Sequence, residues 1–350
     1  MNSCSDCFSS PYLKDIIARN KNIGDCNFCG STEVSIYQPR ELLLFFKNIF
    51  DLYSLNEEGS LIENQIEIDF PNKIFSTLLH TNKKLLIEAI AEDEKEYYKS
   101  ILKEKISLSY HTKPESSEKV NILQVSWEAL VAEIKNTNRF HLTNKFDLEK
   151  LSRLLLRDER IIDKGKIFYR GRISSKDGFD ILNMGHPPLD KTKQGRANPE
   201  GISYLYLAND LETTIFETRA TLYDYISIGE FRINENIKVV NLRNSENFDP
   251  IFLADDDEKL EDFMIHLPFI SKLEFELAKP LRRNDNILDY LPTQYLCEFI
   301  KSMGFDGVEY RSSLNPRGFN LAIFNPQKIE CIKASVHEIH GINYEYKPIE

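Results

Sequence analysis

Four of the six cysteines lie within the first 29 residues, and their spacing constrains the fold more than any other feature of the sequence. Cys4 and Cys7 form one C-x2-C pair, and Cys26 and Cys29 form a second. Each pair supplies two thiolates from one tight turn, and Gly30 lets the backbone curl around a metal ion. Two such pairs at this separation are typical of four-cysteine zinc sites. We therefore expect a structural zinc ion, because four protein ligands leave no open position for a catalytic water.

The composition excludes several classes of protein. The chain has 350 residues, with 44 Lys and Arg against 55 Asp and Glu, which gives a formal charge of −11. A protein that coats a nucleic-acid backbone needs clustered positive charge, so nucleic acid is not an expected partner. No apolar run approaches the roughly 18 residues of a membrane span. The first residues also lack the basic and apolar regions of a signal peptide. The sequence therefore predicts a cytoplasmic protein without a membrane association.

Changes of sequence pattern along the chain predict three regions. Residues 1–35 form the predicted zinc module, residues 36–157 are predicted to be mainly helical, and residues 158–350 contain most of the expected strands. In the helical region Ser126 and Asp147 each precede an apolar stripe with helical spacing, which is typical of helix N-caps.

The last region alternates between strand and helix patterns. Residues 166–172 (KIFYRGR) and 201–208 (GISYLYLA) read as strands, and Asp210 is predicted to cap the helix that follows. Residues 308–313 and 319–324 read as the two strands of a hairpin. In the segment 201–208 the two predicted faces carry Ser203, Leu205 and Leu207 on one side and Tyr204, Tyr206 and Ala208 on the other. Strands and helices of this kind predict a mixed α+β fold behind a zinc-stapled, mainly helical part.

One constellation in this region can carry chemistry. Arg196 lies on a glycine-flanked loop, Tyr206 lies on the strand that follows, and Glu217 lies on the next helix. An arginine, a tyrosine and a carboxylate on successive elements can converge at one end of a strand. The spacing alone is compatible with a ligand site, but ordinary surface and core roles account for such a spacing more often.

Three segments of the sequence resemble the RES domain family, which is named for its Arg, Glu and Ser. They are KIFYRGR at 166–172, GRANPEGISYLYLANDLETTIFE at 195–217 and PTQYLCEFIKSMGFDGVEYRSSLNPRGFNLAIF at 292–324. The cysteine pairs CSDCF and GDCNFCG also look like an N-terminal module of the HEPN/RES type. Ala197 departs from the pattern, since the family often has an aromatic residue after the arginine.

The resemblance implies a fold similar to ADP-ribosyltransferases and an enzyme that degrades NAD+, acting as a toxin or a defence effector. The implied reaction is phosphorolysis to nicotinamide and ADP-ribose 1″-phosphate. Arg196, Glu217 and Ser312 match the family's catalytic residues, with Ser313 as the fallback for the serine. Arg170 and Tyr206 match its NAD+-binding residues, and Arg172 competes with Arg170 for that role. The implied partners are NAD+, phosphate and an antitoxin or trigger protein, and a homo-oligomer is left open.

The chemistry of these side chains fits the implied roles. Breaking the nicotinamide–ribose bond passes through an oxocarbenium-like state, which a carboxylate such as Glu217 can stabilise. Nicotinamide leaves as a neutral ring, so no acid has to protonate it. The forked donors of Arg170 and Arg196 suit a pyrophosphate or a free phosphate. Tyr206 can stack near the nicotinamide ribose, and Ser312 can position a phosphate or ribose oxygen.

Two alternative classes remain at this point. The same pocket can serve an ADP-ribosyltransferase that modifies a macromolecule, or an NAD+ glycohydrolase, because these reactions differ only in the acceptor. In the other class residues 1–157 bind or cleave RNA. HEPN ribonucleases place an arginine and a histidine about a turn apart on one helix, whereas Arg139 and His141 are only two residues apart and would face different sides. We therefore rank the RNA-cleaving function below the NAD+-cleaving one.

Overall fold

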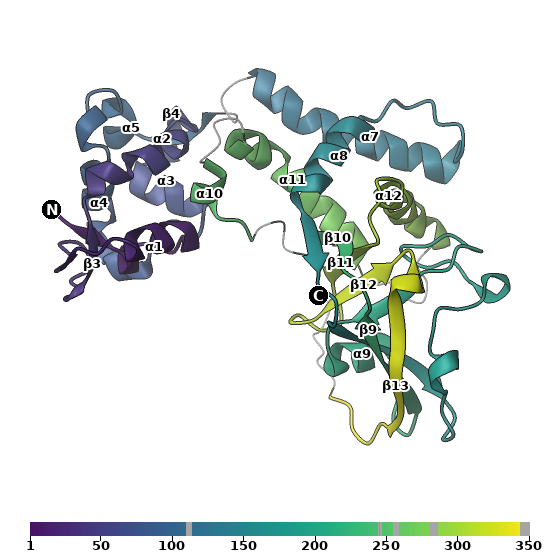
Figure 1. The fold of residues 1–350 in the computed structure, drawn as a ribbon. Coiled ribbons are helices and arrows are strands. Elements are labelled where there is room, and N and C mark those ends of the chain that lie inside the picture. Colours follow the sequence, from purple (N-terminus) through teal and green to yellow (C-terminus); the bar gives the residue numbers. More distant parts are fainter. Residues whose placement is uncertain (110–113, 244, 246, 255–258, 280–285, 344–350) are drawn as a thin grey trace. The chain divides into compact units, whose positions relative to one another are not determined.

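The chain folds into two compact units, which are described here one at a time. In the computed structural model residues 1–109, 114–243, 245, 247–254, 259–279 and 286–343 are described. The first unit comprises Met1–Ile122 and Glu246–Pro268, and the second comprises Leu123–Ser245 and Phe269–Glu350. Both contain helices and strands (Figure 1), which agrees with the predicted α+β class. The sequence-based division into residues 1–35, 36–157 and 158–350 remains a prediction.

The first unit is a helical assembly with two small sheets. Its strand β3 (Val34–Tyr37) lies between β1 (Ser3–Cys4) and β2 (Ile23–Gly24) in one sheet, and β4 (Tyr53–Ser60) pairs with β5 (Ile106–Leu108) in the other. The second pair was not predicted. The helices of this unit are α1 (Pro11–Ala18), α2 (Leu43–Phe50), α3 (Ile62–Asp69), α4 (Lys83–Ile90), α5 (Lys99–Lys103) and α10 (Pro250–Ala254). The helices α7 (Pro114–Asn136) and α11 (Lys259–Ala278) contribute residues to both units.

An eight-stranded sheet forms the frame of the second unit. The strand order is β13-β9-β7-β8-β12-β11-β10-β6, and the pairs are antiparallel except for β10 with β11. The strands are β6 (Glu159–Ile162), β7 (Ile167–Ser174), β8 (Leu205–Ala208), β9 (Tyr225–Ile233), β10 (Ile237–Leu242), β11 (Gly307–Arg311), β12 (Phe319–Ile323) and β13 (Ile329–Glu338). The helices confined to this unit are α8 (Leu148–Arg157), α9 (Leu211–Thr218) and α12 (Leu291–Ser302).

The sheet consists of two halves that join at a narrow seam. Strands β7 and β9 share eight residue pairs, whereas β7 and β8 share only the pair Tyr169 and Ala208. Buried side chains of both halves meet in one core, which includes Phe168 of β7, Phe231 of β9 and Leu321 of β12. The two halves therefore pack against each other through this core. The seam is the single residue pair between β7 and β8, beyond which these two strands separate.

A second core covers the opposite face of the strands β8, β10, β11 and β12. Helices α7, α8, α11 and α12 supply its apolar side chains, and Trp127 is almost fully buried there. The predicted faces of residues 204–207 are confirmed, because Leu205 and Leu207 lie in the first core and Tyr204 and Tyr206 lie in or against the second.

Two local expectations were wrong in their boundaries. The strand predicted from Gly201 begins only at Leu205, because Gly201 has a φ of +81° and Ser203 donates its hydroxyl to the carbonyl of Pro187 at 2.7 Å. Ser126 is not an N-cap, since helix α7 begins at Pro114 and the Ser126 hydroxyl bonds back to the Leu123 carbonyl. The side chains of Asp147 and Asp210 do cap their helices as predicted.

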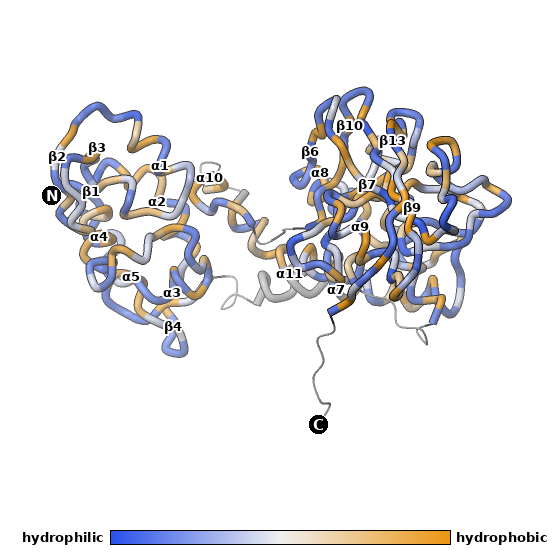
Figure 2. The backbone as a smooth tube through the Cα atoms, turned by 90° about the horizontal axis from the view of Figure 1, so that it is seen from below, coloured by the Kyte–Doolittle hydropathy of each residue, from blue (hydrophilic) through white to orange (hydrophobic). Residues whose placement is uncertain are grey.

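Hydrophobic residues are spread through both units. Figure 2 shows hydrophilic segments interrupting the hydrophobic ones along the chain. No helix among the described residues is long and apolar enough to cross a membrane.

Candidate active site

The candidate site is a pocket at the seam of the sheet. One row of paired residues crosses four strands there, with Tyr310 of β11 opposite Asn320 of β12, Asn320 opposite Ala208 of β8, and Ala208 opposite Tyr169 of β7. All four residues line a cavity of about 270 Å³. Because β7 and β8 separate beyond this row, the sheet leaves an opening that side chains from both halves reach.

Helix α9 closes one wall of the pocket and carries Glu217. The Asp210 carboxylate accepts a hydrogen bond from the backbone N–H of Thr213 at 2.7 Å, which fixes the start of the helix. The helix lies very close to β7, because a Cβ placed on Gly171 would be only 2.6 Å from Cγ2 of Thr218 and 3.0 Å from Cγ2 of Thr214. A glycine at this strand position therefore allows the last turn of α9 to lie against the sheet.

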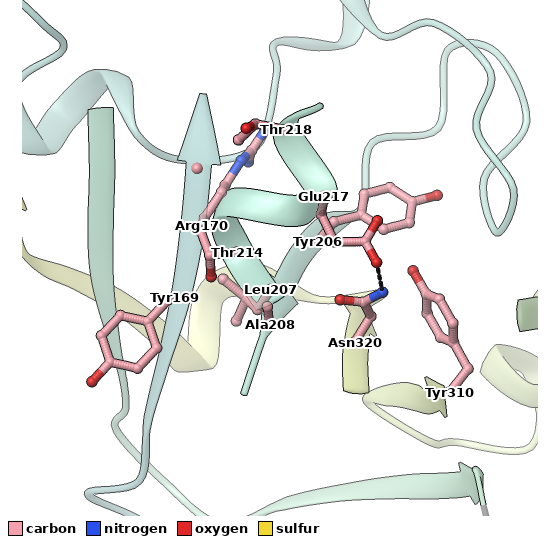
Figure 3. Close-up of a pocket in the computed structure, with 11 residues that line it drawn as sticks. Tyr169, Arg170, Tyr206, Leu207, Ala208, Thr214, Glu217, Thr218, Tyr310 and Asn320 are labelled. Atoms are coloured by element: carbon pink, nitrogen blue, oxygen red, sulfur yellow. Dashed lines mark hydrogen bonds between the residues drawn. The ribbon is translucent and has the colours of Figure 1, made fainter. Parts of the chain in front are cut away.

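The Glu217 side chain is exposed to solvent, but one of its oxygens is fixed. Its Oε1 accepts a hydrogen bond from the Ser312 hydroxyl at 2.6 Å and another from the Asn320 amide at 2.7 Å. Both donors are buried, with 6% and 7% of their surfaces exposed. Figure 3 shows Asn320 and Tyr310 pointing toward the Glu217 carboxylate. The predicted serine thus lies beside the predicted glutamate, where it holds the carboxylate directly.

Two tyrosines flank this carboxylate and differ in their hydrogen bonds. The Tyr206 hydroxyl donates to the side-chain oxygen of Asn198 at 2.7 Å and accepts from the backbone N–H of Ala197 at 3.1 Å. It therefore braces the loop before β8. The Tyr310 hydroxyl has no hydrogen-bond partner within the described part of the chain. Burial raises the pKa of both tyrosines above the usual value, so both hydroxyls stay neutral at physiological pH.

Arg170 brings positive charge to the pocket from strand β7. Its Nη1 donates to the carbonyl of Gly185 at 2.7 Å, which orients the guanidinium while its other N–H groups stay available. Burial lowers the pKa of Arg170 to about 10, and the Arg172 charge contributes to this decrease. The side chain therefore remains cationic at neutral pH.

Arg196 is not among the residues that line this cavity. Its Nη1 donates to the carbonyl of Leu277 at 2.8 Å, and the carbonyl of Arg196 accepts a hydrogen bond from Thr293 of α12. Its positive charge still acts on Tyr206 and Tyr310, since it opposes the rise in both pKa values. Arg196 therefore lies next to the site and is held by backbone and helix contacts.

Two residues that were not predicted from the sequence, Asn320 and Tyr310, lie beside the predicted ones. Asn320 is a polar residue within the otherwise apolar strand sequence FNLAI, and this interruption could have marked it as a functional candidate. Tyr310 precedes Ser312 by two residues, and an alternating strand places such residues on one face. Both lie inside a segment that was quoted for the family resemblance, yet only their positions across the sheet show what they contact.

The four N-terminal cysteines come together as predicted. Their sulfur atoms all lie within 4.8 Å of one another, with 3.4 Å between Cys4 and Cys29 and between Cys7 and Cys26. Tetrahedral zinc with bonds of about 2.3 Å places its sulfur ligands about 3.8 Å apart, so this cluster can hold a metal ion of that size. The backbone N–H of Phe28 points to the Cys26 sulfur at 3.4 Å, as expected for support of a thiolate.

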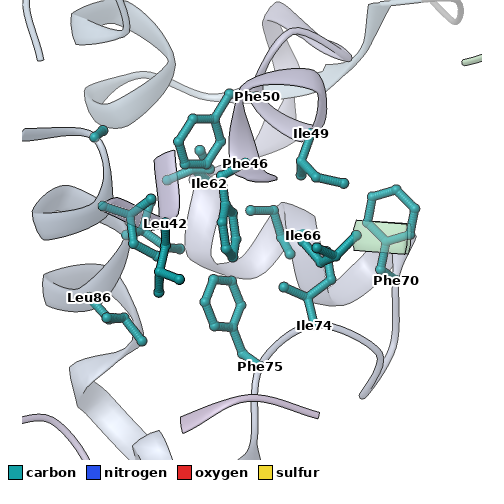
Figure 4. Packing of buried hydrophobic residues seen from close by; sticks show 14 of the residues in the cluster. Leu42, Phe46, Ile49, Phe50, Ile62, Ile66, Phe70, Ile74, Phe75 and Leu86 are labelled. Atoms are coloured by element: carbon teal, nitrogen blue, oxygen red, sulfur yellow. The ribbon is translucent and has the colours of Figure 1, made fainter. Parts of the chain in front are cut away.

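The cysteine cluster rests on the core of the first unit. Phe8, which follows Cys7, packs against Phe46 and Phe75 with ring centroids 6.3 and 6.0 Å apart. Figure 4 shows Phe46 and Phe75 within this core, together with side chains from α2 and α3. The module is therefore continuous with the apolar interior of its unit.

Arg139 and His141 do not form the pair that an RNA-cleaving helix would need. Helix α7 ends at Asn136, and both residues lie exposed in the segment after it. The Arg139 side chain donates to the carbonyl of Ile134. The two residues therefore do not share a helical face.

A comparison with curated proteins finds no match. Among solved structures, the chain is similar to a chain of the crystal structure described as the M. tuberculosis MbcT-MbcA toxin-antitoxin complex. The sequence identity is 13%, the TM-score is 0.32, and the match covers 54% of this chain and 93% of the other. The family model described as the RES domain matches residues 172–346, half of the sequence, which include Glu217, Ser312 and Asn320. The chain therefore belongs to the RES domain family.

Proposed function

We propose that this protein cleaves the bond between nicotinamide and ribose in NAD+. The observation that carries the proposal is that the pocket combines the Glu217 carboxylate, the Arg170 guanidinium and two neutral tyrosines. Its volume is close to the lower end of the roughly 300–1,000 Å³ that small-molecule sites occupy. The nicotinamide riboside half of the dinucleotide is thus the part we assign to this cavity.

Glu217 supplies the negative charge that the reaction needs. As the glycosidic bond breaks, its electron pair moves to the ring nitrogen of nicotinamide, and positive charge develops on the ribose. A carboxylate beside that ribose stabilises the oxocarbenium-like state. The departing ring changes from a cation to a neutral molecule and takes up no proton. One carboxylate is therefore enough for the cleavage step, which agrees with Glu217 being the one acidic residue among the described residues that line the cavity.

The anionic part of the substrate requires the arginines. Arg170 keeps N–H donors free after its bond to Gly185, and such forked donors bind phosphate oxygens strongly. Arg196 lies near the two tyrosines and is the second candidate for this role. Tyr206 offers its ring surface, because its hydroxyl is already used by the loop before β8.

For the acceptor we propose inorganic phosphate. A phosphate oxygen would form a bond to the ribose carbon as nicotinamide leaves, giving ADP-ribose 1″-phosphate.

The decisive experiment incubates the purified protein with NAD+ in buffers with and without phosphate and separates the products by chromatography. Phosphate-dependent release of nicotinamide is the expected result. Nicotinamide released equally without phosphate would indicate a glycohydrolase. Label transferred from NAD+ to a protein or nucleic acid in a cell extract would indicate a transferase. Unchanged NAD+ in every arm, with folded protein, would contradict the proposal.

We further propose that the cysteine cluster binds structural zinc.

We also propose that the NAD+-cleaving activity makes the protein a toxin, which a partner protein restrains. Loss of NAD+ deprives a cell of its main redox cofactor, so unrestrained cleavage would stop growth. Expression of the chain should therefore arrest growth, and Glu217→Ala should remove this effect. Growth arrest that persists with Glu217→Ala would separate the toxicity from the pocket.

A further inference from the structure

We propose that Asn320 is the positioning residue for Glu217: it and Ser312 occupy one carboxylate oxygen, so that the other faces the substrate. This inference rests on the proposed NAD+ cleavage and extends it. Both hydrogen bonds go to Oε1, at 2.6 Å from Ser312 and 2.7 Å from Asn320. Oε2 has no partner within the described part of the chain. The carboxylate therefore has one anchored oxygen and one that is available to a ribose hydroxyl or to the developing positive charge.

The direction of both hydrogen bonds is fixed by their surroundings. The Ser312 oxygen accepts hydrogen bonds from the backbone N–H groups of Leu314 and Asn315, at 3.2 and 3.1 Å. Its single proton is therefore directed to Glu217. Asn320 donates through its amide, which carries no charge at any physiological pH. Both side chains therefore act as donors to the same carboxylate oxygen.

The turn between β11 and β12, together with β12, contacts helix α9 at both of its ends. At the start of the helix, the Asn315 amide donates to the Thr213 hydroxyl at 2.9 Å, and a Cβ on Gly318 would be 2.0 Å from that same hydroxyl. At the end of the helix, Ser312 and Asn320 hold Glu217. All four of these partners come from β12 or from the turn between β11 and β12. The hairpin thus contacts both ends of the helix that carries Glu217.

Asn320 lines the cavity, but its amide donates to Glu217 and acts through that carboxylate. It is 7% exposed and lies between Tyr310 and Ala208 in the row of residues that crosses the sheet. The small side chain of Ala208 leaves the amide room to reach α9. A residue so enclosed orients the carboxylate, and misplacement of a reacting group by about 1 Å can reduce a rate by about 100-fold.

The test compares Asn320→Ala and Asn320→Asp with the unaltered protein, and uses Asn236→Asp, in the exposed turn between β9 and β10, as the matched control. We expect Asn320→Ala to lower kcat for nicotinamide release about 10- to 100-fold, with KM changed by less than about threefold. Asn320→Asp keeps the shape of the side chain and places a second carboxylate against Oε1. Since two such carboxylates resist ionising together, the acid limb of its pH–rate profile should move up by about one unit or more. The Asn236→Asp profile should match the unaltered protein.

A second readout does not depend on activity. The melting temperature of Asn320→Asp, relative to the unaltered protein, should fall between pH 5 and pH 8, because the paired carboxylates repel each other once both are ionised. If the unaltered protein leaves NAD+ intact, the proposed function fails, and this stability measurement still tests the contact. If it cleaves NAD+ while Asn320→Ala keeps its kcat, or while Asn320→Asp keeps its pH–rate profile, the positioning role is overturned. Asn320→Asp carries the test if the alanine variant does not fold.

Discussion

The cysteine cluster and the pocket hold reactive side chains in opposite ways. The cluster takes four identical ligands from 26 consecutive residues, and three of them are buried. The pocket takes different side chains from β7, β8, α9, β11 and β12, and its key carboxylate, Glu217, is exposed. A site of the first kind binds one ion and stabilises its unit, since no ligand position is left open. A site of the second kind can admit and release a molecule. The difference supports placing the proposed NAD+ cleavage in the second unit.

The largest effect expected from this contrast is at Glu217. Glu217→Ala should lower the rate of nicotinamide release by about 1,000-fold or more, because it removes the charge that stabilises the oxocarbenium-like state. Bound metal should be unchanged. Glu212→Ala, on the exposed first turn of the same helix, is the matched control and should keep the full rate. A Glu217→Ala rate within tenfold of the unaltered protein would contradict the mechanism.

A smaller effect is expected at the arginines. Arg170→Ala should raise KM for NAD+ by about 10- to 100-fold, which corresponds to the loss of one or two charged hydrogen bonds to phosphate. Arg196→Ala should also weaken binding, but less, because its guanidinium already serves the Leu277 carbonyl. Steady-state kinetics of both variants give the comparison. A larger defect at Arg196 would reverse the assignment of the two side chains.

The cysteine cluster should respond in stability and leave catalysis intact. Cys26→Ser removes one of four ligands, so we expect loss of bound zinc and a decrease of more than about 3 kcal/mol in the free energy of unfolding of the first unit. The rate per folded molecule should be unchanged. Cys331→Ser, outside the cluster and half-buried, is the control. Metal analysis and thermal unfolding measure these effects. Unchanged stability after complete zinc removal would argue against a structural metal.

The smallest effect is expected at Tyr310. Tyr310→Phe removes one neutral hydroxyl from the pocket, which corresponds to about a 2- to 13-fold loss in kcat/KM for a single hydrogen bond to the substrate. Tyr204→Phe is a close control, because the Tyr204 hydroxyl is buried without a hydrogen-bond partner in the described structure and lies outside the pocket lining. Equal rates for both variants would show that the Tyr310 hydroxyl does not bind the substrate.

Features set by neighbouring residues could be predicted from the sequence. The caps at Asp147 and Asp210 depend on a hydrogen bond to a backbone N–H three residues later, and both form. The cysteine cluster depends on two short pairs, and its four residues meet. Ser126 misled the prediction, because a serine inside a helix can bond back to a carbonyl in the preceding turn.

Features set by distant residues could not be predicted in the same way. Asn320 reaches Glu217 only because β12 pairs with β8 in one register, and a shift by one residue would turn it to the other face. The separation of Arg196 from the pocket lining depends on its bond to Leu277 in α11. Neither contact leaves a local pattern in the sequence. The family model matches residues 172–346, which contain the second and third segments of the resemblance but only the last residue of the first. The geometry shows which side chains of these segments line one cavity.

The strand order has a consequence for how the protein is made. Strand β8 has β12 as its neighbour on one side, and β9 is joined by β13, so the sheet is completed by the last described strands of the chain. A ribosome releases the N-terminal parts of a chain first. Glu217 is thus synthesised about a hundred residues before Asn320. Until the β11–β12 hairpin emerges, the pocket lacks the lining residues Tyr310 and Asn320. We therefore expect a chain that stops before Ser312 and Asn320 to lack the proposed activity, because both donors that hold Glu217 are missing from it.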